Sequence, residues 1–141
     1  MLKDNMKLVG KLSIAINDEV VQEVNNLVVT TGKNFVASRI KDATASAMSH
    51  MAIGTGSTSP AAGDTALGNE SARVALTSTT VTNADVAYVA SFGAGTGTGA
   101  ITEAGLFNAS SSGTLFCRTT FSVVNKGADD SMTITWTVTV S

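Results

Sequence analysis

The stretch SMTITWTVTVS, at residues 131–141, decides the fold because apolar and polar residues alternate along it without a break. Successive side chains of a β-strand point to opposite faces, so the alternation predicts a strand with one apolar face. That face carries Met132, Ile134, Trp136, Val138 and Val140. Burying a Val, Ile or Met side chain is worth about 1.5–3 kcal/mol, so we expect all five residues in a core. The opposite face is threonine, which suits either water or another subunit.

Short strand patterns separated by turn signals fill most of the remaining chain. A first hairpin is predicted within residues 7–24, across a turn at Asn17-Asp18. A second hairpin is predicted to join residues 73–82 to 85–92. A third is predicted to join residues 100–108 to 114–123, and regular spacing of such short strands favours a sandwich or a small barrel.

One helix is expected at about residues 32–47, with Thr31 as its N-cap. Phe35, Val36 and Ile40 fall at helical spacing in this segment. A single further helical turn is expected near residues 64–67, inside a loop that contains the one proline.

The predicted fold class is therefore mainly β: an antiparallel β-sandwich or small barrel with one α-helix and an N-terminal β-hairpin arm. Residues 1–24 are expected to form the arm, which is a candidate anchor or exchange segment. Residues 25–141 are expected to form the sandwich domain, and the 141-residue chain is long enough to bury a sizeable core.

Charged residues make up only 14% of the chain, whereas hydrophobic residues make up 43%. About a quarter of an average globular protein is charged. Either much of the surface contacts other protein, or the exterior is unusually rich in hydroxyl groups. The nine Lys and Arg residues are scattered, which argues against a nucleic-acid partner. No apolar run is long enough to span a membrane, so no membrane partner is expected.

The single cysteine, Cys117, excludes an internal disulfide framework. It lies in a strand pattern, where a small core residue is the simplest interpretation. The first ten residues lack the apolar run of a signal peptide, so synthesis in a cytoplasm is expected.

Motifs that suggest chemistry are weak. GAGTGTG, at residues 93–99, lacks the lysine and the helix of a phosphate-binding loop, so a loop or hinge is favoured. His50 is the only histidine, which leaves too few ligands for zinc and one candidate base for a triad. Asp64, Asp129 and Asp130 offer oxygen ligands, as Glu70 does, but without EF-hand spacing. We expect no catalytic, cofactor-binding or metal-binding residues, and no enzyme activity.

Four charged residues are candidates for structural pairing. Glu70 and Arg73 flank the start of a predicted strand, and Glu103 lies inside the otherwise small and apolar stretch AITEAGLFN. A carboxylate at such a position either faces solvent or pairs with a cation. We expect Glu103 to pair with Arg73 or Arg118 and to pin residues 57–70 to the sheet; simple exposure of Glu103 is the alternative.

Two stretches, MAIGTGSTSPAAGDTALGNESARVAL (residues 51–76) and GAITEAGLFNASSSGTLFCRTTF (residues 99–121), resemble a family of small tailed-bacteriophage structural proteins. Members are described as tail-fibre-like or virion proteins. The resemblance covers roughly residues 25–141 and identifies no catalytic residue. The matching positions are Gly54, Gly56, Asp64, Thr65, Leu67, Glu70, Arg73, Glu103, Gly105, Leu106 and Phe107.

This resemblance implies a virion structural protein, made in the host cytoplasm, that acts by assembly and needs no cofactor. The expected form is an exterior homo-oligomer, with a trimer favoured by the resemblance, most readily associated with a tail or fibre. Other virion proteins, such as the tail or the major capsid protein, are the implied partners. One alternative is a capsid decoration (cement) protein that clamps neighbouring capsomers. A further alternative is a host-glycan-binding module, which would stack sugars on exposed aromatic side chains.

Overall fold

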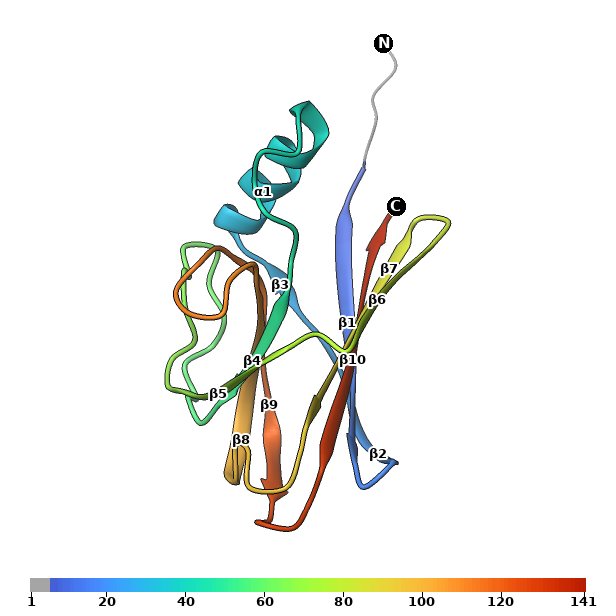
Figure 1. The fold of residues 1–141 in the computed structure, drawn as a ribbon. Coiled ribbons are helices and arrows are strands. Elements are labelled where there is room, and N and C mark those ends of the chain that lie inside the picture. The colour runs from blue at the N-terminus through green and yellow to red at the C-terminus, as the bar shows by residue number, and fades with distance from the viewer. Residues whose placement is uncertain (1–5) are drawn as a thin grey trace.

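The computed structural model describes residues 6–141, which form two five-stranded antiparallel sheets packed face to face, with one helix at their edge (Figure 1). The first sheet has the strand order β2-β1-β10-β7-β6, and the second has the order β3-β9-β8-β4-β5. The elements are β1 (Leu8–Ile16), β2 (Glu19–Asn25), β3 (Leu27–Val28), α1 (Thr30–Lys41), β4 (His50–Gly54), β5 (Glu70–Ala75), β6 (Ser78–Thr82), β7 (Asp85–Phe92), β8 (Gly99–Phe107), β9 (Leu115–Lys126) and β10 (Met132–Val140). The prediction of a mainly β sandwich with one helix is confirmed.

β10 is the central strand of the first sheet and lies between β1 and β7. Met132, Ile134, Trp136 and Val138 are at most 3% exposed, as their alternation predicts. Val140 is 36% exposed, because it ends the strand at the mouth of an open groove. The expectation that Val140 belongs to the core was therefore wrong. The threonine side chains of β10 lie partly exposed on the outer face of the sheet.

The N-terminal hairpin is part of the first sheet. Its turn residues Asn17 and Asp18 have positive φ angles of 49° and 68°, which suits a tight hairpin turn. However, β1 pairs with β10 along its whole length, and its residues Leu12 and Ile14 have no exposed surface. Because these two side chains complete the core, the hairpin is integral to the sandwich and is not the separate arm expected for residues 1–24. Residues 1–5 of that expected arm lie outside the described residues.

The helix is shorter than expected and begins earlier, at Thr30–Lys41 instead of residues 32–47. Thr31 is not the N-cap; its hydroxyl donates a hydrogen bond of 2.8 Å to the Leu115 carbonyl and ties the helix to β9. The helix ends at Lys41 because Ala43 has a positive φ of 56°. Residues 64–67 form no helical turn.

Residues 73–82 divide between the two sheets instead of forming one strand. β5 pairs with β4 in the second sheet, whereas β6 pairs with β7 in the first. The predicted hairpin of residues 73–82 with 85–92 is therefore limited to β6 and β7. The glycine-rich residues 93–99 then carry the chain back to β8, with positive φ at Gly95, Gly97 and Gly99.

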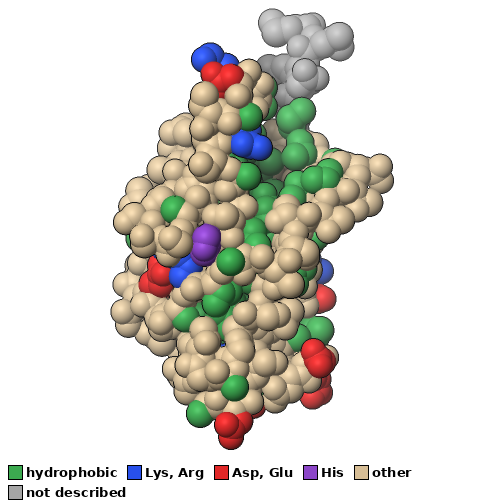
Figure 2. Space-filling model, viewed as in Figure 1, with side chains coloured by type: hydrophobic (Ala, Val, Ile, Leu, Met, Phe, Trp, Pro, Cys, Tyr) green, Lys and Arg blue, Asp and Glu red, His purple; other side chains and the backbone are tan. Residues whose placement is uncertain are grey.

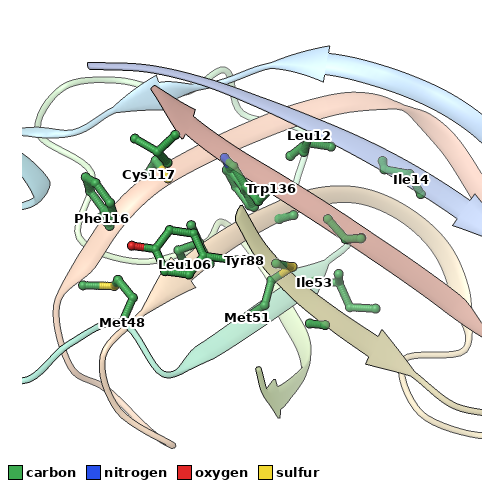
Figure 3. Close-up of a cluster of buried hydrophobic side chains, with 14 of the residues drawn as sticks. Leu12, Ile14, Met48, Met51, Ile53, Tyr88, Leu106, Phe116, Cys117 and Trp136 are labelled. Atoms are coloured by element: carbon green, nitrogen blue, oxygen red, sulfur yellow. The ribbon is translucent and has the colours of Figure 1, made fainter. Parts of the chain in front are cut away.

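The core lies between the two sheets and combines side chains from both (Figure 3). Trp136 lies near its centre with no exposed surface, and its Nε1 donates a hydrogen bond of 3.1 Å to Asn26 Oδ1. Leu12 and Ile14 of the first sheet face Met51, Ile53 and Leu106 of the second, and all five are fully buried. This burial supplies the main driving force for folding.

Candidate functional site

A loop between β4 and β5, at residues 55–69, folds over the outer face of the second sheet. Glu103 lies on that face in β8, opposite Gly54 of β4, and has no exposed surface. A small second core beside it contains Leu67 from the loop and Phe107 and Leu115 from the sheet. The loop is therefore packed onto the sheet by apolar contact as well as by the carboxylate beneath it.

The Glu103 carboxylate accepts five hydrogen bonds. Three come from backbone amides of the loop, those of Gly56, Gly68 and Asn69, each at 2.7 Å. The other two come from Arg118, whose Nη2 is 2.9 Å and whose Nε is 3.3 Å from Oε1. Burial works to raise the pKa of Glu103, but the amides of Asn69, Gly68 and Gly56 together with Arg118 outweigh it and hold the pKa below its usual value. Glu103 is thus an ionised, fully partnered group.

Arg118 extends this network to the far side of the loop. It lies on β9 opposite Gly105, which makes it a diagonal neighbour of Glu103 on the same face, and it is 2% exposed. Its Nη1 donates to Asp64 Oδ2 and its Nη2 to the Thr58 carbonyl, both at 2.9 Å. Arg118 therefore holds the middle of the loop, while Glu103 holds its two ends.

Glycine at two positions lets the loop approach the carboxylate. A Cβ atom at Gly56 would lie 2.4 Å from Glu103 Oε2, closer than any real contact. A Cβ atom at Gly54 would lie 2.3 Å from the Asn69 carbonyl oxygen. Side chains at these positions would force the loop off the sheet, so both glycines serve the network.

Arg73 does not contact Glu103 and instead forms a second, separate network. Its guanidinium makes two hydrogen bonds with Glu70, at 2.7 and 2.9 Å, and lies 3.7 Å from the centre of the Phe107 ring. Its Nη1 donates to the carbonyls of Ala109 and Ser112 in the β8–β9 turn. The structure thus brings Glu103 together with Arg118, and Glu70 with Arg73. The solvent-exposed alternative for Glu103 does not occur.

Two buried or half-buried structural partners were not predicted: Asp64 in the Glu103–Arg118 network, and Lys126 elsewhere in the fold. Asp64 appeared in the sequence as a candidate metal ligand, and the structure places it against Arg118. Lys126, at the end of β9, is 1% exposed and donates to the carbonyls of Gly93 and Asp130, at 2.8 and 2.7 Å. It ties together two of the connections between the sheets, and nothing in the local pattern distinguishes it from a solvated lysine.

The remaining candidate residues lie apart from one another. The Nδ1 of His50 is 2.8 Å from the hydroxyl of the adjacent Ser49. Cys117 is completely buried, and burial raises the pKa of its thiol. Within residues 6–141, no three His, Cys, Asp or Glu side chains are grouped closely enough to hold a metal ion. In the same residues, no helix has both the length and the apolar character needed to cross a membrane.

An apolar groove opens between α1 and the β6–β7 hairpin, with a volume of about 400 Å³. Figure 2 shows it as a band of hydrophobic side chains beside the projecting hairpin. Phe35 and Ile40 line the helix side, while Thr79, Val81 and Tyr88 line the sheet side. Ile40 and Val81 are 80% and 69% exposed, and burial raises the pKa of Tyr88 to about 12.

Comparison of the chain with protein-family models, with curated proteins and with solved structures gives no match in any of the three.

Proposed function

We propose that this chain is a structural part of the exterior of a tailed-bacteriophage virion, homo-oligomeric and associated with the tail or its fibres. The observation that carries the proposal is where the residues of the resemblance lie. Gly54, Gly56, Asp64 and Glu103 meet in one network around the loop at residues 55–69, and Leu67 packs in the small core beneath it. Glu70, Arg73 and Phe107 form the neighbouring network.

Both networks hold surface loops in fixed positions, and this supports a role in assembly. Each oxygen of Glu103 accepts at least two hydrogen bonds within the protein, so neither is left free to act on a substrate. A surface fixed in advance loses little conformational entropy when it binds a neighbour. The sandwich therefore supplies rigid contact surfaces, as a virion component requires.

The threonine face of β10 and the low charge of the chain support contact with other protein. Thr139 donates a hydrogen bond of 2.6 Å to Asp85, and the hydroxyls of Ser91 and Thr133 lie 3.2 Å apart, so polar groups on this face already pair across strands. Such a face can be covered at little desolvation cost. The trimer implied by the resemblance remains a prediction, which the mass of the purified protein tests.

The glycan-binding alternative loses its main support. All seven aromatic residues, one Trp, one Tyr and five Phe, lie within residues 6–141, and none is more than partly exposed. Trp136 has no exposed surface at all. A sugar-stacking platform would need at least one open aromatic face.

The test is to produce particles with and without the gene for this chain and to quantify the protein in purified particles by mass spectrometry. The proposal predicts a fixed number of copies per particle, in keeping with the symmetry of a tail. A number that matches the capsid subunits would favour the cement alternative. Deletion of residues 1–24 is not a suitable variant, because it removes Leu12 and Ile14 from the core. Absence of the protein from complete, infectious particles would refute the proposal.

A further inference from the structure

The four sheet edges differ in how they are protected against pairing with another chain. Edge strands are usually protected by charge, by proline, by a bulge or by shortness. β3 has only two residues, and β5 carries the Glu70–Arg73 ion pair and a register shift against β4. β2 carries Glu19 and Glu23 and a register shift against β1. Each of these three edges has at least one such protection.

β6 has neither charge nor proline. Its five residues, STTVT, are all exposed, and its pairing with β7 runs without a register shift. Four of the five residues are β-branched, the type that best fits a pleated strand. Its backbone groups on the side away from β7 are therefore open to a further strand.

The register with β7 fixes which backbone groups those are. Thr82 pairs with Asp85 across the two-residue turn at Asn83 and Ala84, and in such a hairpin the flanking pair exchanges both hydrogen bonds. Hydrogen-bonded pairs alternate along an antiparallel ladder, so the backbone amide and carbonyl of Thr80 also point towards β7. Thr79 and Val81 direct their amides and carbonyls outward.

β6 is complementary to β6 of a second copy of the chain that is related to the first by a two-fold axis. With Thr80 opposite Thr80 of a second copy, Thr79 of each strand lies opposite Val81 of the other, and the two pairs exchange four hydrogen bonds. The central pair is Thr–Thr, which is favourable across strands, and no charges are brought together. Thr79 and Val81 also line the apolar groove, so the pairing would join the grooves of the two copies and cover Val81.

We propose that β6 is a self-association edge, at which two copies of this chain pair antiparallel about Thr80 and merge their first sheets into one. This inference rests on the homo-oligomeric part of the proposed function and specifies its contact. A two-fold contact gives an even number of subunits: a dimer alone, or a hexamer when combined with a three-fold axis.

The experiment measures the mass of the full chain by sedimentation over a range of concentrations, for wild type and for Thr80→Lys and Thr80→Glu. Each variant places like charges directly opposite each other in the pair, so self-association should weaken by roughly tenfold or more, and the mass should fall to half. A one-to-one mixture of the two variants places Lys opposite Glu and should restore the wild-type mass. Val21→Lys, a charge added at an exposed site on the β2 edge, is the matched control and should leave the mass unchanged.

Thr80 is exposed, so each variant should keep the wild-type far-ultraviolet circular dichroism spectrum and a cooperative unfolding transition, which separates lost pairing from lost folding. A monomeric wild type, or variants with unchanged mass, would overturn the inference. Failure of the mixture to recover the mass would overturn pairing about Thr80. If the wild-type chain is monomeric and Thr80→Lys blocks its loading onto particles, the β6 edge binds another virion protein. That result would refute self-pairing and leave the proposed function standing.

Discussion

The loop at residues 55–69 and the edge strand β6 differ in whether their backbone polar groups have hydrogen-bond partners within the chain. At residues 55–69 each end of the loop is bonded to Glu103 and its middle to Arg118, and the charges involved are almost fully buried. At β6, a few residues further along the chain, five neutral residues are all exposed and the outward backbone groups have no partner within residues 6–141. The first region is complete within one subunit, whereas the second is open to another molecule.

This difference assigns stability to the loop network, and the proposal assigns self-association to β6. Substitutions in the loop network should change the free energy of unfolding and leave self-association alone, unless folding fails. Substitutions along β6 should do the reverse. The predictions below test this division, from the largest expected effect to the smallest.

Arg118→Met should cause the largest loss. It leaves the Glu103 carboxylate buried without its cation, and removing one partner of a buried ion pair costs about 3–5 kcal/mol. Arg73→Met is the matched control, because its partner Glu70 is 31% exposed and can be solvated; we expect a loss of about 1–2 kcal/mol there. Urea denaturation of the two variants provides the measurement, and equal losses would contradict the distinction.

Gly56→Ala should destabilise the protein by about 1–3 kcal/mol, because the new methyl group would overlap Glu103 Oε2. Gly63→Ala, in the same loop, has nothing within 4 Å of the added atom and should be neutral or slightly stabilising. Thermal unfolding of both proteins tests this pair. If Gly63→Ala were as harmful as Gly56→Ala, general loop rigidity would explain the effect better than close approach to the carboxylate.

Acid should weaken the loop network through Glu103. Its pKa is lower in the folded protein than in the unfolded chain, so its contribution is fully present above the unfolded pKa of about 4.3. That contribution is lost as the pH falls through the lower folded pKa. Glu103→Gln should be less stable than wild type at neutral pH, and this difference in stability should narrow as the pH falls below the unfolded pKa of about 4.3. Denaturation curves at several pH values measure this gap, and a constant gap would show that the charge of Glu103 is not involved.

The smallest effect is expected at the apolar groove. Val81→Thr changes a side chain that is 69% exposed, so the free energy of unfolding should stay within about 0.5 kcal/mol of wild type. Val124→Thr makes the same change at a core side chain that is 5% exposed and does not line the groove, and burying the hydroxyl should cost about 1–3 kcal/mol. A comparable loss at both positions would mean that the groove belongs to the core.

The fold was largely predictable because alternation reports burial directly. β10 and the β8–β9 hairpin follow from period-two patterns, and each has one face against the common core. The division of residues 73–82 was not predictable, since both halves have strand-like composition and nothing local marks the change of sheet at Leu76. The role of the N-terminal hairpin was missed for a related reason: pairing between β1 and β10 joins the two ends of the chain.

The candidate site was predictable in its principal residue but not in its partners. The carboxylate in the apolar stretch AITEAGLFN singled out Glu103, but the sequence left open whether it faces solvent or pairs with Arg73 or Arg118. Only the register that places Arg118 diagonally across from Glu103 selects one of them. The three amide donors could not be inferred, because backbone groups carry no sequence signal.

The most direct test of the central claim, that this protein functions by assembly on a virion, is an image reconstruction of intact particles. The account predicts density for the sandwich on the particle exterior, in symmetry-related copies, with the loop at residues 55–69 ordered and the β6 edges of neighbouring copies adjacent. Particles that carry no such density, and that assemble and infect normally when the gene is removed, would contradict it.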